Sequence, residues 1–140
     1  MSPIAELPET VDGIMIPVET GCLLDNYAQD VVDVLEQLDR EYMPVVDSFL
    51  HRHPVGVVTS ANLRTLVRDA GSAPVADVLI AGIPLIRSGT RLDRLSDGLA
   101  RSPVALIVDQ AGALMGYVEV TVLLPYLLGL QGHGEPGGEA

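Results

Sequence analysis

Hydrophobic and polar residues follow a helical period in the stretch after Asn26, where apolar side chains recur every three or four positions. The positions between them are mostly acidic or otherwise polar, so the pattern predicts a surface helix with one face in the core. Asn26, with Gln29 three positions further on, is typical of the N-cap of such a helix. The apolar face of the predicted helix holds Val31, Val34, Leu35, Leu38 and Tyr42.

Two valine-rich runs follow this helix, at residues 45–46 and 55–58, and predict the strands of a β-hairpin. The loop that joins them contains His51 and His53. We interpret these as an exposed pair, because neither has a cysteine or a third histidine at metal-ligand spacing. A second helix is predicted over residues 61–70, with Ser60 as its N-cap and Gly71 as its end.

The rest of the chain predicts the same order of elements a second time. Strand 83–87 is followed by a helix over 91–100, a hairpin with strands 104–108 and 113–118, and a short last helix. We expect Pro125 in the first turn or so of that last helix and Gly129 at its end.

Short segments of the two halves also resemble each other. Residues 11–16 resemble residues 75–80, and Gly56 corresponds to Gly116. Each unit has the order β-α-β-β-α and roughly 60 residues, which is marginal for an independent core. The sequence therefore predicts an α/β (α+β) fold in which two repeats pack about a pseudo-two-fold axis. The predicted divisions are a flexible N-terminus at 1–10, repeat 1 at 11–72, repeat 2 at 73–130 and a disordered tail at 131–140.

Charge narrows the classes of function. Nineteen acidic residues stand against eight arginines and no lysine, which gives a formal net charge of -11. This excess of negative charge argues against a nucleic-acid or anionic-membrane surface. The lack of lysine excludes a Schiff-base lysine and a P-loop lysine.

The sequence contains no pattern typical of export or membrane insertion. It has no apolar run long enough to span a bilayer, and no basic residue before Arg40 that would form the start of a signal peptide. The single cysteine, Cys22, cannot form an internal disulfide. We therefore expect a cytoplasmic protein.

Three features together resemble a tandem cystathionine-beta-synthase (CBS) domain pair, or Bateman module, over residues 11–129. They are the repeated order of elements, the apolar-Pro-Val-Val-Asp run at 43–47, and the Gly-apolar-apolar-Thr-x-x-Asn run at 56–62. The resemblance implies a regulatory module without catalytic residues, whose clefts between the repeats bind adenosine-containing ligands. It also implies a homodimer that forms through the helices.

The resemblance further implies a nucleotide site in repeat 1. Apolar walls would hold the base, a hydroxyl would bind phosphate, and Asn62 would bind the ribose, although the family more often has Asp there. The implied residues are Met43, Pro44, Val45, Val58, Thr59, Asn62 and Arg64. An alternative stays open, in which Thr59 and Ser60 only cap the helix and Asn62 is solvated. In repeat 2, Glu119 and Val122 replace the hydroxyl and the ribose acceptor, so we expect no nucleotide in the second cleft.

The sequence therefore predicts a stand-alone CBS pair that binds AMP, ADP, ATP or S-adenosylmethionine as a regulatory ligand, requires no cofactor and modulates an unidentified protein. One alternative is a ligand-independent dimerisation or interaction module. Its apolar helix residues would include Leu123, Leu124, Leu127 and Leu128. Another is a Mg²⁺-sensing module that uses Asp30, Asp33 and Glu36, although we expect those carboxylates to form a solvated face and expect no metal site.

Overall fold

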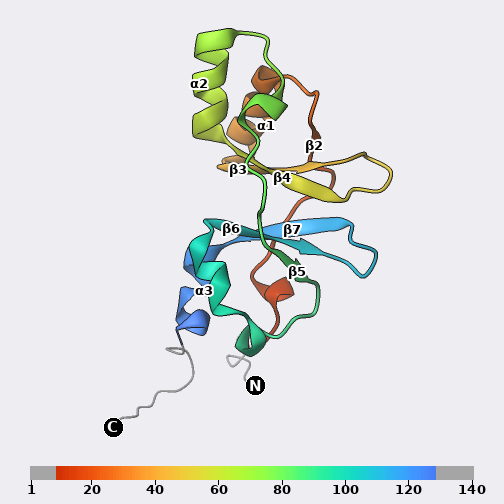
Figure 1. The fold of residues 1–140 in the computed structure, drawn as a ribbon, viewed down its shortest axis with the longest axis vertical. Helices are drawn as coiled ribbons and strands as arrows, with labels where there is room; N and C mark the ends of the chain where they lie inside the picture. Colours follow the sequence, from red (N-terminus) through yellow and green to blue (C-terminus); the bar gives the residue numbers. More distant parts are fainter. Residues whose placement is uncertain (1–8, 129–140) are drawn as a thin grey trace.

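The computed structural model describes residues 9–128, and these form two halves that meet sheet against sheet (Figure 1). In the first half, β2 (Cys22–Leu23), β3 (Tyr42–Val46) and β4 (Pro54–Thr59) form a three-stranded sheet. In the second half, β1 (Ile16–Pro17), β7 (Leu114–Glu119), β6 (Val104–Val108) and β5 (Leu85–Arg87) form a four-stranded sheet. The predicted α/β class and both hairpins are confirmed.

Helices cover the outer face of each sheet (Figure 1). The first half carries α1 (Ala28–Leu38) and α2 (Ser60–Ala70), and the second half carries α3 (Val120–Leu127). None of the helices in the described part of the chain is long and apolar enough to cross a bilayer. Pro125 lies inside α3, in its second turn, and Gly129 lies outside the described residues.

Two predicted helix caps are wrong. The N-cap of α2 is Thr59 and not Ser60, because the Oγ1 of Thr59 accepts a hydrogen bond from the Asn62 amide at 3.1 Å. The N-cap residue of α1 is Tyr27. The Oδ1 of Asn26 instead accepts from the Leu23 amide at 2.8 Å and so closes the turn before the helix.

The prediction of a helix over residues 91–100 is also wrong. Two short 3-10 helices, η4 (Leu92–Arg94) and η5 (Asp97–Arg101), stand there, and the backbone between them is extended. The reason is local, since Ser96 and Gly98 are poor helix formers and the Oγ of Ser96 accepts from the Gly98 amide at 3.2 Å.

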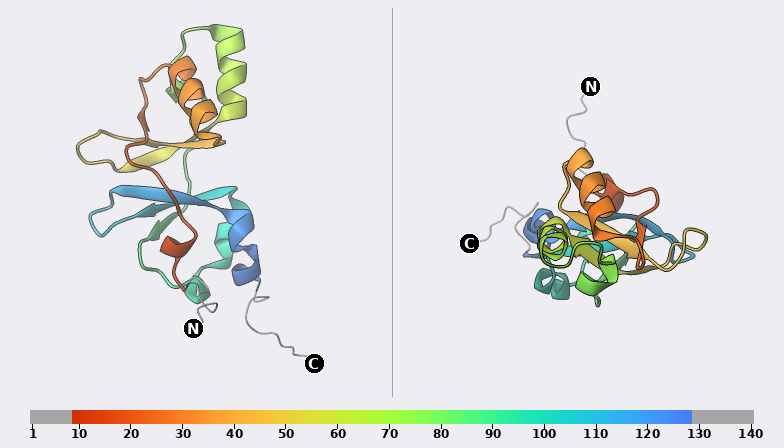
Figure 2. Two further views of the ribbon diagram at one scale, coloured as in Figure 1. Left: turned by 180° about the vertical axis from the view of Figure 1, so that it is seen from behind. Right: turned by 90° about the horizontal axis from the view of Figure 1, so that it is seen from above.

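The first segment of each predicted repeat crosses to the other half (Figure 2). Residues 10–17 open the predicted first repeat, yet β1 pairs antiparallel with β7 of the second half. Likewise, Ile80 pairs with Val57 of the first half. The short helices η2 (Val11–Gly13) and η3 (Val75–Val78) bring Val11 and Val75 into the core of the half they join. Each half therefore needs the other for a complete core.

The interior has three apolar layers. One lies under α1 and α2, one lies under α3 and the 3-10 helices, and the third fills the space between the sheets. The middle layer consists of Val46, Val57, Val104, Leu106, Leu114 and Tyr117. Val34 and Leu38 were predicted for the core but are 42% and 50% exposed, so that part of the helix prediction is wrong.

Candidate functional site

Two adjoining cavities open beside the C-terminal end of α1. The first, which we call the interhalf cavity, has a volume of about 750 Å³ and lies where residues 35–41 and α2 meet the second half. The second, the α1 cavity, has a volume of about 640 Å³ and lies between α1 and residues 17–22. Their walls share Leu35, Leu38 and Arg40. Both volumes are in the range of small-molecule sites, about 300–1,000 Å³.

The structure places most of the predicted site residues away from these cavities. Met43, Pro44, Val45 and Val58 are buried in the first half, and of these only Met43 lines the α1 cavity. Arg64 lines the interhalf cavity.

Thr59 and Asn62 stand at the beginning of α2. Thr59 caps the helix through its Oγ1, and Asn62 is exposed to solvent. The structure therefore contains a helix cap at Thr59, as in the alternative without a ligand. A contact of Thr59 or Asn62 with a ligand stays a prediction.

The interhalf cavity contains residues that sequence reasoning missed. Ser60 lies on it from α2, and Tyr117 and Glu119 reach it from β7. Glu119 was expected to affect only the second cleft, yet it lines the same cavity as Arg64 of repeat 1. Ser60 follows Thr59 directly in the sequence motif, whereas no local signal places a β7 residue beside α2.

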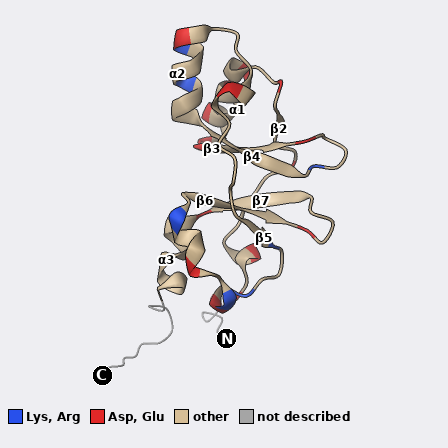
Figure 3. Cartoon of the chain, in the orientation of Figure 1, with Lys and Arg blue, Asp and Glu red and all other residues tan. Residues whose placement is uncertain are grey.

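Acidic side chains dominate the rim of the interhalf cavity. It is lined by four carboxylates and two guanidinium groups, namely Glu36, Asp39, Glu41, Glu119, Arg40 and Arg64. Arg64 Nη2 lies 3.1 Å from Glu36 Oε2, in a pair that is more than half exposed. Arg40 Nη1 donates to the carbonyl oxygen of Pro17 at 3.1 Å. Figure 3 shows acidic and basic positions on both halves of the chain.

The phenol groups of two tyrosines, Tyr42 and Tyr117, are affected by the charges around the interhalf cavity. The rings of Tyr42 and Tyr117 pack edge to face with centroids 6.0 Å apart. Burial raises the pKa of both phenols, and Glu119 and Glu41 raise it further. Arg40 acts in the opposite direction on the pKa of Tyr117 but does not outweigh these effects. The surroundings of the two rings therefore disfavour additional negative charge.

Several solved structures share this arrangement of sheets and helices. CBSX2 from Arabidopsis thaliana, a CBS-pair protein, is 19% identical with a TM-score of 0.67, over 91% of this chain and 99% of that chain. The CBS domain of a bacterial CNNM/CorC family Mg²⁺ transporter, in complex with ATP, is 21% identical with a TM-score of 0.67, over 86% of this chain and 88% of that chain. The chain has the fold of a tandem CBS-domain pair.

A third CBS-pair structure, CBSX2 in complex with AMP, is 20% identical with a TM-score of 0.61, over 89% of this chain and 99% of that chain. No protein-family model matches the sequence, and no curated protein matches it either. At such low identity the likeness shows the fold of the CBS pair, while the ligand has to be argued from this chain's own residues.

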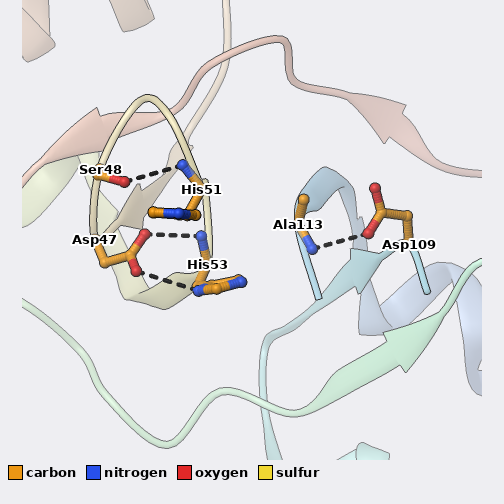
Figure 4. Close-up of polar contacts among 6 residues, drawn as sticks. All are labelled: Asp47, Ser48, His51, His53, Asp109 and Ala113. Carbon is orange, nitrogen blue, oxygen red and sulfur yellow. Dashed lines mark hydrogen bonds and ion pairs between the residues drawn. The ribbon is translucent and has the colours of Figure 1, made fainter. Parts of the chain in front are cut away.

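Two equivalent aspartates close the hairpin loops (Figure 4). Asp47 accepts from the His53 amide at 2.9 Å, and its Oδ2 lies 3.2 Å from Nδ1 of the same residue. Asp109 accepts from the Ala113 amide at 3.0 Å, and this hydrogen bond lowers the pKa of Asp109. The rings of His51 and His53 are exposed and stack with centroids 5.8 Å apart. Asp47 and Asp109 therefore have a structural role, which is to close the two hairpin loops.

Two of the three carboxylates named for the Mg²⁺ alternative, Asp33 and Glu36, form hydrogen bonds or ion pairs with other side chains. Asp33 accepts from Gln29 Nε2 at 2.9 Å, and Glu36 pairs with Arg64. Within residues 9–128, no three His, Cys, Asp or Glu side chains come together in a way that would hold a metal ion.

The apolar residues of the dimerisation alternative are only partly available. Leu123 is fully buried in the core of the second half, and Leu127 packs against that core. Val122 and Leu128 are 48% and 64% exposed. An interface on α3 would therefore use Val122 and Leu128 and not Leu123.

Proposed function

We propose that this CBS pair is a non-catalytic regulatory module that binds an adenosine-containing ligand at the interhalf cavity. The observation that carries the proposal is the junction of an apolar cavity with a polar one, where Arg40 and two leucines belong to both walls. A nucleoside has the same division, because its base needs apolar walls and its sugar needs polar partners. AMP, ADP, ATP and S-adenosylmethionine are the candidates, and no cofactor is required.

The α1 cavity offers the apolar surface for a base. Val31, Leu35 and Met43 line it together with the backbone of residues 17–22. On the polar side, Ser60 takes the hydroxyl role that the sequence assigned to Thr59, because Ser60 lines the interhalf cavity and Thr59 lines neither cavity. Two similar structures contain AMP or ATP, which supports an adenine compound as the class of ligand.

Binding at this place would connect the two halves. The interhalf cavity is formed by Leu35 and Ser60 from the first half and by Ile16 and Tyr117, which pack in the sheet of the second half. A ligand between them stabilises those arrangements of the halves in which both sets of contacts form. A change in a partner's affinity follows only if the ligand binds the two arrangements unequally.

A ligand-independent interaction module is the second candidate function. The exposed apolar residues Val122 and Leu128 on and after α3 favour it, together with Val34 and Leu38 on α1. Val34 and Leu38 also line the α1 cavity, so a contact between two copies that covered them would close that cavity to a ligand. A contact through Val122 and Leu128 would leave both cavities open.

A thermal-shift panel tests the proposed function. AMP, ADP, ATP and S-adenosylmethionine would each be added to the whole chain, with Ser60→Ala as the site variant and Ser72→Ala as the matched control at an exposed position. A ligand at about 100 times its Kd adds about 2.7 kcal/mol and raises Tm by several degrees. We expect a rise for at least one compound that is smaller in Ser60→Ala and unchanged in Ser72→Ala. No rise with any compound at millimolar concentration would contradict the proposal.

A further inference from the structure

The charges around the interhalf cavity bear on which adenosine compound it accepts, an inference that rests on the proposed function. We infer that the cavity selects an adenosyl compound whose remaining part is positively charged, and that it discriminates against the phosphate groups of adenine nucleotides. The charge balance of the rim and the hydrogen bonds at the start of α2 support this.

The charge balance of the rim is negative. Glu36 and Arg64 lie 3.1 Å apart and largely compensate each other. Asp39, Glu41 and Glu119 then remain with Arg40, so carboxylates exceed guanidinium groups by two. A phosphate of nearly two negative charges would enter against this excess, whereas a cation would be attracted.

The start of α2 is poorly prepared for a phosphate. An anion at a helix N-terminus uses the free backbone N–H groups of the first turn. Here the Ser60 amide donates to the carbonyl oxygen of Glu41 at 2.8 Å, and the Asn62 amide donates to Oγ1 of Thr59 at 3.1 Å. Two of the donors that a phosphate would use are therefore already engaged.

The remaining guanidinium group of the rim uses one of its N–H donors within the protein. Arg40 donates to the Pro17 carbonyl oxygen at 3.1 Å across the junction of the two cavities, where it can contact a sugar or a base edge. Glu41 and Glu119 both line the interhalf cavity, as Tyr117 does. This pair is the natural counter-charge for a cationic group next to the ribose.

S-adenosylmethionine has the required chemistry, with an adenosyl group joined to a sulfonium, an ammonium and a carboxylate that together carry one net positive charge. S-adenosylhomocysteine is a suitable comparison, since it lacks the methyl group and the sulfonium charge and keeps the remainder. Adenosine supplies the neutral reference, and AMP supplies the phosphate. Together these four probes separate recognition of the adenosyl group from recognition of charge.

Isothermal titration of the whole chain with the four compounds tests the inference. We expect S-adenosylmethionine to bind on the order of tenfold more tightly than S-adenosylhomocysteine at low salt, as for one unit charge near a carboxylate in a partly hydrated site. AMP should bind more weakly than adenosine. In 1 M salt, where the screening length is about 3 Å, the preference for S-adenosylmethionine should shrink.

The double substitution Glu41→Gln and Glu119→Gln identifies the residues responsible. We expect it to weaken S-adenosylmethionine binding and to strengthen AMP binding, so that the ratio of their affinities falls by at least about tenfold. Glu9→Gln is the matched control, because Glu9 is exposed and lines neither cavity. The four-probe comparison on the unaltered chain stays decisive if the double variant does not fold.

The outcomes separate the inference from the proposed function. If AMP binds as tightly as S-adenosylmethionine, or if the sulfonium compound and its neutral partner bind equally, the inference is overturned while adenosine recognition stands. If none of the four compounds binds at millimolar concentration, the proposed function itself fails. The predicted order of affinities, with the loss of that order in the double variant, supports both.

Discussion

Two glycines show at the scale of single residues why the repeated sequence motif has its form. A Cβ atom at Gly56 would overlap the carbonyl oxygen of Ile80, and one at Gly116 would overlap that of Ile16. These carbonyl groups belong to the segments that cross between the halves. The motif glycine therefore allows the crossing backbone to lie directly against each hairpin.

Gly116→Ala should destabilise the chain by about 2 kcal/mol or more, because the nearest atoms are backbone and Met15 and have little room to move. Gly98→Ala is the matched control, since the nearest atom to its added Cβ is Oγ of Ser96 at an ordinary contact distance of 3.5 Å. Urea unfolding measures both. Equal free energies of unfolding for the two variants would show that the close approach is not a constraint.

Cys22 is predicted to be chemically inert in the folded chain. The thiol is 4% exposed, and burial raises its pKa to about 12, so little thiolate exists at pH 8. A thiol-labelling reagent at pH 8 should therefore react slowly with the native protein and quickly in denaturing urea. Fast labelling of the native protein would contradict the burial of Cys22 beside the α1 cavity.

At the scale of elements, strands and hairpins were predictable and the crossing segments were not. Valine-rich runs carry their own signal for β3, β4 and β6. β1 has only two residues and forms by pairing with β7, which is far away in the sequence. No local sequence pattern therefore predicts it. The helix predicted over 91–100 failed because Ser96 and Gly98 stop it locally, although Leu92 and Leu99 keep helix-like apolar spacing.

In the candidate site too, residues with a local sequence signal were predictable and residues brought in by long-range packing were not. Sequence resemblance pointed to the start of α2, where Arg64 does line the interhalf cavity. It missed Glu119 and Tyr117, because they reach the cavity only through the packing of one sheet on the other. It also assigned apolar contacts to Val45 and Val58, which are fully buried in the core of the first half.

The crossing segment before β1 is held by Asp12, and this gives a pH-dependent prediction. Hydrogen bonds from the Ser88 hydroxyl at 2.6 Å and the Gly89 amide at 2.7 Å lower the pKa of Asp12. A carboxyl whose pKa falls on folding stabilises the fold above its unfolded pKa of about 3.9, and this contribution disappears as pH falls through the folded pKa.

Asp12→Asn should therefore lower the free energy of unfolding by about 1 kcal/mol at pH 7 and by less at pH 3. Asp77→Asn is the control, since the corresponding short helix η3 carries an exposed aspartate. Chemical denaturation at several pH values measures the difference. An effect of Asp12→Asn that grows as pH falls would contradict the assignment.

At the scale of the whole molecule, two halves exchange their leading segments and enclose a ligand-sized cavity, while exposed apolar residues remain on the outside. The exchange ties the halves into one unit, so a ligand between them acts on the complete molecule. Within residues 120–128, Leu128 is the most exposed large apolar residue. We therefore expect it in the proposed contact between two copies.

Leu128→Asp should shift the chain from dimer to monomer in sedimentation, because a buried, unpaired carboxylate disfavours the interface. Leu50→Asp is the matched control, since Leu50 is 83% exposed in the loop between β3 and β4. Sedimentation unchanged by Leu128→Asp would remove this surface from the proposed interface and leave the ligand site unaffected.

Amide chemical shifts during titration with adenosine compounds test the central claim most directly. The account predicts that the shifted amides gather around the interhalf cavity and belong to both halves, including Glu41 and Ser60 on one side and Ile16, Tyr117 and Glu119 on the other. Shifts confined to the loops of Figure 4, or no shifts at millimolar ligand, would contradict it.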